Sequence, residues 1–154
     1  MTEAVFPGSF DPLTLGHLDV IERLAANFPS VVVAVAHNPA KHYLFSAERR
    51  AQLIAEAAAH LPNVSVEVVQ GLVAKAFAGP GRILVKGVRS PSDWENEVGQ
   101  AAVNRDLSGL ETLLLPTSAR YAVVSSSLVK ELNSIGAPVD PYVPPVVARA
   151  LKED

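Results

Sequence analysis

The segment FPGSFDPLTLGH, residues 6–17, combines glycines, a serine and a histidine in a spacing that could bind phosphate. It follows a short apolar run and precedes an amphipathic stretch, so we expect a strand, a loop and the start of a helix. Gly8 lets a ligand approach the backbone, and Ser9 and Phe10 provide backbone N–H groups. His17 falls at the expected helix N-terminus, where unpaired N–H groups and the macrodipole favour an anion. A lone histidine at a helix end is more often structural, so this motif alone decides nothing.

The two most familiar phosphate-binding loops are absent from the sequence. It contains no G-x-x-x-x-G-K-[ST] segment, and the glycines of GSFDPLTLG do not match G-x-G-x-x-G. The second apolar run ends in AHNPAK, residues 36–41, without an acidic side chain for the hydroxyls of a ribose. These observations argue against an NAD-binding protein.

Cations and hydroxyl groups recur after the other strand-like runs. Lys41 follows the second run, Lys86 and Arg89 flank Gly87 after the fourth, and three serines, residues 125–127, precede a helix after the fifth. Lysines are usually only solvated, and serines are ordinary helix caps. Two cations beside a glycine and a serine cluster at a helix N-terminus also suit phosphate groups. The pattern therefore leaves both interpretations open.

A scaffold that brings these residues together is predicted by the hydrophobic pattern. We expect five strands, at residues 4–6, 31–36, 64–69, 82–85 and 111–115, and six helices, at residues 18–28, 47–60, 72–78, 92–107, 126–135 and 145–152. Strands separated by helices imply βαβ units with right-handed crossovers. The predicted fold is α/β: a Rossmann-like, doubly wound, five-stranded parallel sheet in a single domain. Ligands bind such sheets beyond the carboxyl ends of the strands.

The composition excludes several classes of protein. The chain has 154 residues, 49% of them hydrophobic, and a formal net charge of −3, which argues against a nucleic-acid binder or a membrane-surface protein. Without cysteine, it has no disulfide, thiolate metal site or cysteine nucleophile. Its four histidines do not match metal-ligand spacing, and no acid and histidine are placed around a serine as in a triad. No apolar run could span a bilayer and the N-terminus lacks a basic leader, so we expect a cytoplasmic protein.

Several segments together resemble one known family. Thr14-Leu15-Gly16-His17 is similar to the T-x-G-H version of the HxGH motif of the nucleotidyltransferase superfamily. VFPGSFDPLTLGH, AVAHNPAK, VKGVRSPSDWENE, VVSSSLVKEL and VPPVVARAL occur in the order and spacing of the bacterial phosphopantetheine adenylyltransferases. The resemblance covers essentially residues 1–154, as a single nucleotidyltransferase domain. It implies reversible transfer of the adenylyl group from ATP to 4′-phosphopantetheine, giving dephospho-coenzyme A and pyrophosphate, by in-line attack without a covalent intermediate.

The resemblance also implies roles for individual residues. The catalytic residues it implies are His17, Lys41 and Arg89. The residues that contact the acceptor substrate would be Ser9, Lys41, Val73 and Lys86. The residues that contact ATP would be Ser9, Phe10, His17, Gly87, Val88, Arg89, Glu97, Tyr121, Ala122, Val123, Val124, Ser125, Ser126 and Ser127.

Cofactor, assembly and regulation follow from the same resemblance. Mg²⁺ would arrive bound to ATP, without a dedicated set of protein ligands. The family assembles as a homohexamer, and coenzyme A is a candidate inhibitor. The chain departs from the family pattern at Asn96, where an aromatic residue is common, and around Gly99, where side chains are bulkier. These departures concern helix packing or contacts between subunits and not the reacting groups.

Two other functions remain open at this point. A related nucleotidyltransferase could act on another phosphorylated acceptor, such as nicotinamide mononucleotide or glycerol phosphate. The match at Lys41, Val73 and Lys86 favours 4′-phosphopantetheine as the acceptor, so this alternative is second. A non-catalytic nucleotide-binding regulator could also keep the pocket, although it would be expected to lose a residue such as His17 first.

Overall fold

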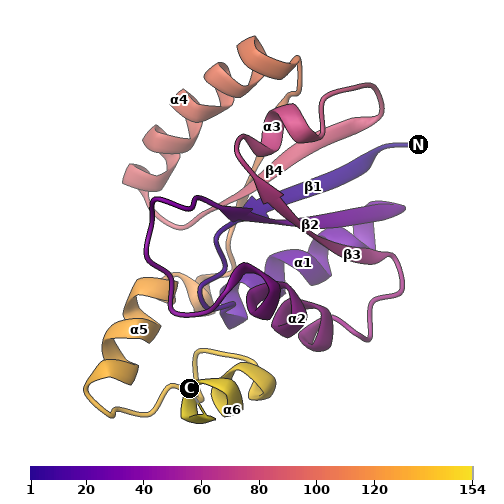
Figure 1. Ribbon diagram of the computed structural model, residues 1–154. Coiled ribbons are helices and arrows are strands. Elements are labelled where there is room, and N and C mark those ends of the chain that lie inside the picture. The colour runs from indigo at the N-terminus through magenta and orange to yellow at the C-terminus, as the bar shows by residue number, and fades with distance from the viewer. Residues whose placement is uncertain (154) are drawn as a thin grey trace.

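The computed structural model describes residues 1–153 and places five strands in one sheet (Figure 1). The strands are β1 (Glu3–Gly8), β2 (Ser30–His37), β3 (Val64–Gln70), β4 (Arg82–Val88) and β5 (Thr112–Pro116). Their order is β3-β2-β1-β4-β5, and every neighbouring pair is parallel. Helices cover both faces, so the predicted α/β, Rossmann-like fold with a five-stranded parallel sheet is confirmed.

The central strands are apolar on both sides because each face of the sheet is covered. In β2, with the sequence SVVVAVAH, residues 31–35 are all buried, and so are residues 4–6 of β1. Successive side chains of a strand point to opposite faces. Phe6 and Val33 accordingly belong to one core, whereas Val5 and Val32 belong to a second core on the other face.

The helices divide between the two faces of the sheet (Figure 1). The larger core receives side chains from α1 (Leu15–Asn27), α2 (Ala47–Ala57), α5 (Ser126–Ser134) and α6 (Pro145–Glu153). The smaller core receives Ala74 of α3 (Val73–Ala76), and α4 (Pro91–Ser108) lies against α3, β4 and β5. A short 3₁₀ helix, η1 (Ala119–Tyr121), leads from β5 toward α5.

The helix that follows β1 begins three residues earlier than the sequence analysis predicted. The hydroxyl of Thr14 accepts a hydrogen bond from the backbone N–H of His17, so Thr14 is the N-cap and α1 starts at Leu15. The prediction of a start at residue 18 was therefore wrong. His17 lies inside the first turn of the helix instead of before it, and this position fixes the direction of its side chain.

Helix α4 has an unusual surface for a helix that packs on a sheet. None of its residues is buried, and Trp94, Val98, Val103 and Leu107 are each about half-exposed. A side chain added at Gly99 would have no atom within 4 Å. The departures from the family pattern at Asn96 and Gly99 therefore lie on a surface that packs on nothing else within residues 1–153. None of the helices in this range is both long and apolar enough to cross a membrane.

The order of the strands creates a crevice at the carboxyl end of the sheet. From β1 the chain passes outward to β2 and β3, and it then crosses to the other side of β1 for β4 and β5. The loops after β1 and β4 consequently leave the sheet in opposite directions. In doubly wound sheets, ligands bind at such a switch point.

Candidate active site

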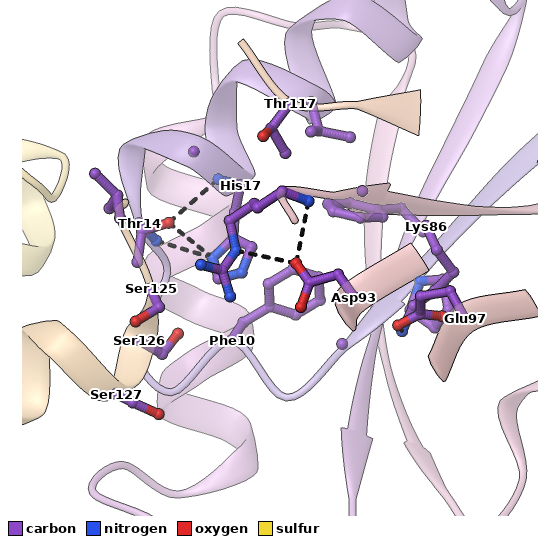
Figure 2. Close-up of a pocket in the computed structure, with 18 residues that line it drawn as sticks. Phe10, Thr14, His17, Lys86, Asp93, Glu97, Thr117, Ser125, Ser126 and Ser127 are labelled. Atoms are coloured by element: carbon purple, nitrogen blue, oxygen red, sulfur yellow. Dashed lines mark hydrogen bonds and ion pairs between the residues drawn. The ribbon is translucent and has the colours of Figure 1, made fainter. Parts of the chain in front are cut away.

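A pocket of about 310 Å³ lies at this switch point (Figure 2). Residues from five parts of the chain line it: the end of β1 with the loop after it, the start of α1, the end of β4 with α4, the loop after β5, and the start of α5. The polar and charged side chains that line it are Thr14, His17, Lys86, Arg89, Asp93, Glu97, Thr117, Ser125, Ser126 and Ser127. The arrangement concentrates cations, hydroxyl groups and one imidazole on a single cavity, which suits a phosphorylated ligand.

The orientation of the His17 ring is fixed by Thr14 through a capping box. The backbone N–H of Thr14 donates to Nδ1 of His17 at 3.1 Å, while the backbone N–H of His17 is 3.2 Å from Oγ1 of Thr14. A ring nitrogen that accepts a backbone N–H carries no proton. The neutral imidazole therefore holds its proton on Nε2, which is the nitrogen left free to donate into the pocket.

Burial and neighbouring cations keep the His17 ring neutral. Desolvation is the largest cause, and the positive charges of Arg89 and Lys86 add to it, so that the pKa of His17 falls from 6.5 to about 4. At neutral pH the side chain is an uncharged hydrogen-bond donor.

The depressed pKa of His17 gives a testable pH dependence. We expect the His17 signal in NMR spectra of the ligand-free protein to titrate with a midpoint near pH 4, not near 6.5. Between these values the unfolded chain binds this proton and the folded chain does not, so His17 makes the folded state progressively less stable as the pH falls through this range. A midpoint above pH 6 would contradict the described environment of the ring.

Phe10 supports the imidazole from below. Its ring is buried and meets the His17 ring edge-to-face, with 5.1 Å between centroids and 80° between planes (Figure 2). Its backbone has a φ of 51°, in the left-handed region that non-glycine residues seldom adopt. A Cβ at Gly8 would lie only 2.9 Å from the Phe10 ring. Gly8 thus leaves room for this ring, a reason beyond the access for a ligand that the sequence suggested.

Two cations face the pocket, each held by a carboxylate from α4. Nζ of Lys86 is 3.5 Å from Oε1 of Glu97, and Nε of Arg89 is 3.6 Å from Oδ2 of Asp93. The backbone N–H of Arg89 also donates to the same Asp93 oxygen at 3.0 Å. Both pairs are partly exposed, so they add little stability, but they limit the positions of the two cations. The two cations are thereby kept at the pocket wall, where they can interact with an anion.

The serine cluster at the start of α5 contains hydroxyl groups bonded within the protein and groups that face the pocket. Oγ of Ser125 accepts from the backbone N–H of Leu128 as an N-cap, and the hydroxyl of Ser126 donates to the carbonyl oxygen of Pro12 at 2.8 Å. Both hydroxyls are therefore engaged within the protein. The free N–H groups of the first turn of α5 and the hydroxyl of Ser127 remain on the pocket side, where an anion is favoured.

The structure brings many of the expected site residues together at this pocket. The expected residues that line it are Phe10, His17, Lys86, Gly87, Arg89, Glu97, Val124, Ser125, Ser126 and Ser127. Tyr121 lies beside the start of α1, because a Cβ atom added at Gly16 would be 3.5 Å from the Cβ atom of Tyr121. Val88 is buried, whereas Val123 is largely exposed, and neither they nor Ala122 line the pocket.

Two residues expected to contact the acceptor lie at a neighbouring pocket of about 410 Å³. Ser9 and Lys41 line it, together with Ala36, His37, Asn38, Pro39, Tyr43, Gly71 and Leu72. Val73 is half-buried against the smaller core, next to Leu72. The first loop, after β1, separates the two pockets, with Ser9 on one side and Phe10 on the other.

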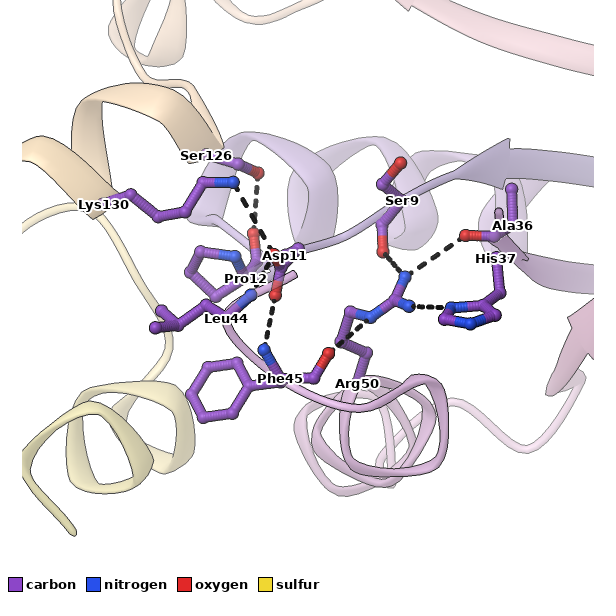
Figure 3. A network of polar contacts seen from close by, with 10 residues as sticks. All are labelled: Ser9, Asp11, Pro12, Ala36, His37, Leu44, Phe45, Arg50, Ser126 and Lys130. Carbon is purple, nitrogen blue, oxygen red and sulfur yellow. Dashed lines mark hydrogen bonds and ion pairs between the residues drawn. The ribbon is translucent and has the colours of Figure 1, made fainter. Parts of the chain in front are cut away.

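Five further residues were missed by the sequence reasoning. Thr14, Asp93 and Thr117 line the main pocket, and two charged residues, Asp11 and Arg50, are buried next to the first loop (Figure 3). Thr14 had a usable signal, because a threonine three residues before His17 has the spacing of a capping box. Asp93 contacts Arg89 four residues earlier, whereas the positions of Asp11, Arg50 and Thr117 depend on contacts between distant segments.

Comparison with known proteins identifies the family. The model of the cytidylyltransferase-like family matches residues 5–132. A phosphopantetheine adenylyltransferase from Symbiobacterium thermophilum is 50% identical over 155 aligned positions, which cover 99% of this chain and 96% of the relative. The chain belongs to the cytidylyltransferase-like family. The resemblance to the phosphopantetheine adenylyltransferases and the assignment of the chain as a nucleotidyltransferase are thereby confirmed.

The range that the family model matches includes most of the residues that line the main pocket. The matched residues, 5–132, contain both the T-x-G-H segment and the serine cluster at α5. A nucleotidyltransferase needs a place for a triphosphate and a place for an acceptor. The two pockets on either side of the first loop are candidates for those places.

Proposed function

We propose that the chain transfers the adenylyl group of ATP to 4′-phosphopantetheine, reversibly, to give dephospho-coenzyme A and pyrophosphate. The observation that carries this proposal is the pocket at the switch point of the sheet, which His17, Lys86 and Arg89 line together. The name and the near full-length match of the 50% identical relative support the choice of acceptor. In this proposal, ATP occupies the main pocket and the acceptor phosphate approaches from the Ser9 and Lys41 side.

The reaction is a direct displacement at the α-phosphorus of ATP. A phosphate oxygen of the acceptor forms a bond to this phosphorus, and the bond to the bridging oxygen breaks, so pyrophosphate leaves with the electron pair. Negative charge on the phosphoryl oxygens then needs donors that are already in position. The Nε2 proton of His17 and the cation of Arg89 supply them, and no covalent intermediate is required.

The remaining expected residues divide between the two substrates. Ser9 and Lys41 orient the attacking phosphate, with Val73 and Lys86 on the acceptor side. Gly87, Val88, Arg89 and Glu97 follow the nucleotide on the β4 side, and residues 121–127 follow it on the η1 and α5 side. Holding both reactants in line supplies part of the rate acceleration without any further chemistry.

Mg²⁺ is proposed to enter bound to the nucleotide. Within residues 1–153 no group of three or more His, Asp or Glu side chains converges on one point, and the two carboxylates of the main pocket are paired with cations. This donor set fits an ion carried mainly by phosphate oxygens and water. When bound, the ion would neutralise charge on the triphosphate.

A cytoplasmic location, where such substrates occur, belongs to the same proposal, as does inhibition by coenzyme A.

We also propose that the protein is a homohexamer. The half-exposed apolar side chains of α4, among them Trp94 and Val103, support this, because a second subunit would cover them. We expect mass photometry at nanomolar to micromolar concentration to give six times the monomer mass of 16.3 kDa. Placing a charge on this surface with Val103→Glu should shift the distribution to smaller species. A monomer in the unmodified protein would refute the proposal.

Release of pyrophosphate tests the activity directly. The protein is mixed with ATP and Mg²⁺, with and without 4′-phosphopantetheine, and in parallel with nicotinamide mononucleotide or glycerol phosphate. We expect release that depends on 4′-phosphopantetheine and is absent with the other two acceptors. Release with one of those alone would assign a different acceptor, and no release despite ATP binding would favour a regulatory protein.

A further inference from the structure

Arg50 is a buried charge that holds several segments of the acceptor side together. It is 1% exposed, and its guanidinium donates to the carbonyl oxygens of Ser9 at 2.7 Å, Phe45 at 3.1 Å and Ala36 at 3.2 Å (Figure 3). Its Nη2 atom is 2.9 Å from Nδ1 of His37. These contacts join the loop after β1, the end of β2 and the segment that leads into α2.

Arg50 has an aromatic neighbour where a carboxylate would be expected. Among residues 1–153, none of the ion pairs includes Arg50. Instead, its Cζ atom lies 4.0 Å from the centroid of the Tyr43 ring. Such a cation–π contact is favourable where the cation is removed from water. The His37 ring packs on the same tyrosine, with 5.1 Å between centroids.

The hydroxyl of Tyr43 reaches the turn that carries Lys41. The backbone N–H of Asn38 donates to this hydroxyl at 3.0 Å. Asn38 in turn forms the turn, because its side-chain oxygen accepts from the N–H of Ala40 and its carbonyl oxygen accepts from the N–H of Lys41. Arg50, Tyr43 and Asn38 thus form a continuous series of contacts from α2 to the backbone of Lys41.

We propose that Tyr43, stacked on Arg50, is a positioning residue that sets the place of Lys41 for the phosphate of the acceptor. The proposal rests on the proposed function, which assigns Lys41 to the acceptor. Tyr43 lines the acceptor-side pocket and is not among the residues that line the main pocket with His17. Its loss should therefore affect acceptor binding, whereas ATP binding should not change.

Two substitutions separate the hydroxyl from the ring. Tyr43→Phe keeps the stack on Arg50 but removes the hydroxyl oxygen to which the N–H of Asn38 donates a hydrogen bond. We expect this variant to bind 4′-phosphopantetheine about 3- to 10-fold more weakly. Tyr43→Leu also removes the ring, and we expect a larger loss of about 10- to 30-fold. For both variants, Kd and KM for ATP should stay within about 2-fold of the unmodified protein, because the main pocket is unchanged.

Isothermal titration calorimetry with each substrate, followed by steady-state kinetics, is the test. Tyr142→Phe is the matched control, since it makes the same chemical change at a half-buried tyrosine packed against the larger core. A graded loss confined to the acceptor supports the proposal. Unchanged acceptor binding in both Tyr43 variants overturns it, as does an equal loss for ATP together with a lower melting temperature. If the unmodified protein binds ATP but not 4′-phosphopantetheine, the proposed function fails, and the inference fails with it.

Discussion

Replacing His17 with alanine is expected to lower kcat by at least ~10²-fold while changing the KM of either substrate only slightly. The Nε2 proton is the group lost, and it is useful mainly when charge builds up on the α-phosphoryl oxygens. A donor that acts only in the transition state contributes to kcat and not to ground-state binding. The expected loss corresponds to about 2.7 kcal/mol, within the range for removal of one positioned donor from an oxyanion site.

His60→Ala is the matched control for this experiment. His60 is exposed on the protein surface, where its Nε2 atom meets Glu22 at 3.1 Å, and it does not line the main pocket. We expect the control to keep kcat within about 2-fold, because surface substitutions away from a site have small effects. A His17→Ala variant with a higher KM and an unchanged kcat would make His17 a binding residue and contradict the proposed mechanism.

A drop in stability of His17→Ala must be measured separately from its drop in rate. The imidazole accepts the backbone N–H of Thr14, so its removal leaves half of the capping box. Loss of a helix cap costs about 1 kcal/mol, which lowers the melting temperature of a chain this long by only a few degrees. Kinetics at 25 °C on a folded variant therefore report the missing donor and not unfolding.

Most of the fold could be predicted because its core strands are unbroken apolar runs. The segment that became β2 is too short for a buried helix and too apolar for a half-exposed strand. The errors lie at the ends of elements: α1 starts three residues before the predicted residue 18, and β1 extends beyond the predicted residue 6. Pro7 and Gly8 look like loop residues, yet they continue β1 by pairing with Ala34 and Val35 of β2. The pairs with β4 stop at Val5, so the missing N–H of Pro7 costs no hydrogen bond there.

The site was predictable only where its residues follow a local rule. His17, Arg89 and the serines sit at loop ends or helix starts, where the sequence indicates an anion site. The separation of Lys41 from His17 into different pockets was not predictable, because it depends on which side of the first loop each side chain takes. Arg50 looks like a surface residue of an amphipathic helix, and only the packing of three segments around it shows otherwise.

Asp11 gives the largest expected effect on stability. Its carboxylate is almost completely buried and accepts the backbone N–H groups of Leu44 at 2.7 Å and Phe45 at 2.9 Å, with Nζ of Lys130 at 3.6 Å (Figure 3). Asp11→Ala would leave these N–H groups without an acceptor. We expect the free energy of unfolding to fall by about 2–4 kcal/mol, and the melting temperature by about 5–15 °C. Denaturant unfolding and differential scanning calorimetry measure the two quantities.

The matched control for Asp11 is Asp140→Ala, at an exposed carboxylate 3.9 Å from Nζ of Lys152. An exposed pair of this kind contributes little, so the control should lose less than about 1 kcal/mol. Asp11→Asn keeps the shape and one oxygen acceptor but turns an amide donor toward a second N–H, and an intermediate loss is expected. If Asp11→Ala loses no more than Asp140→Ala, the carboxylate does not hold the first loop against the segment before α2. The burial of an acid at this position would then need another explanation.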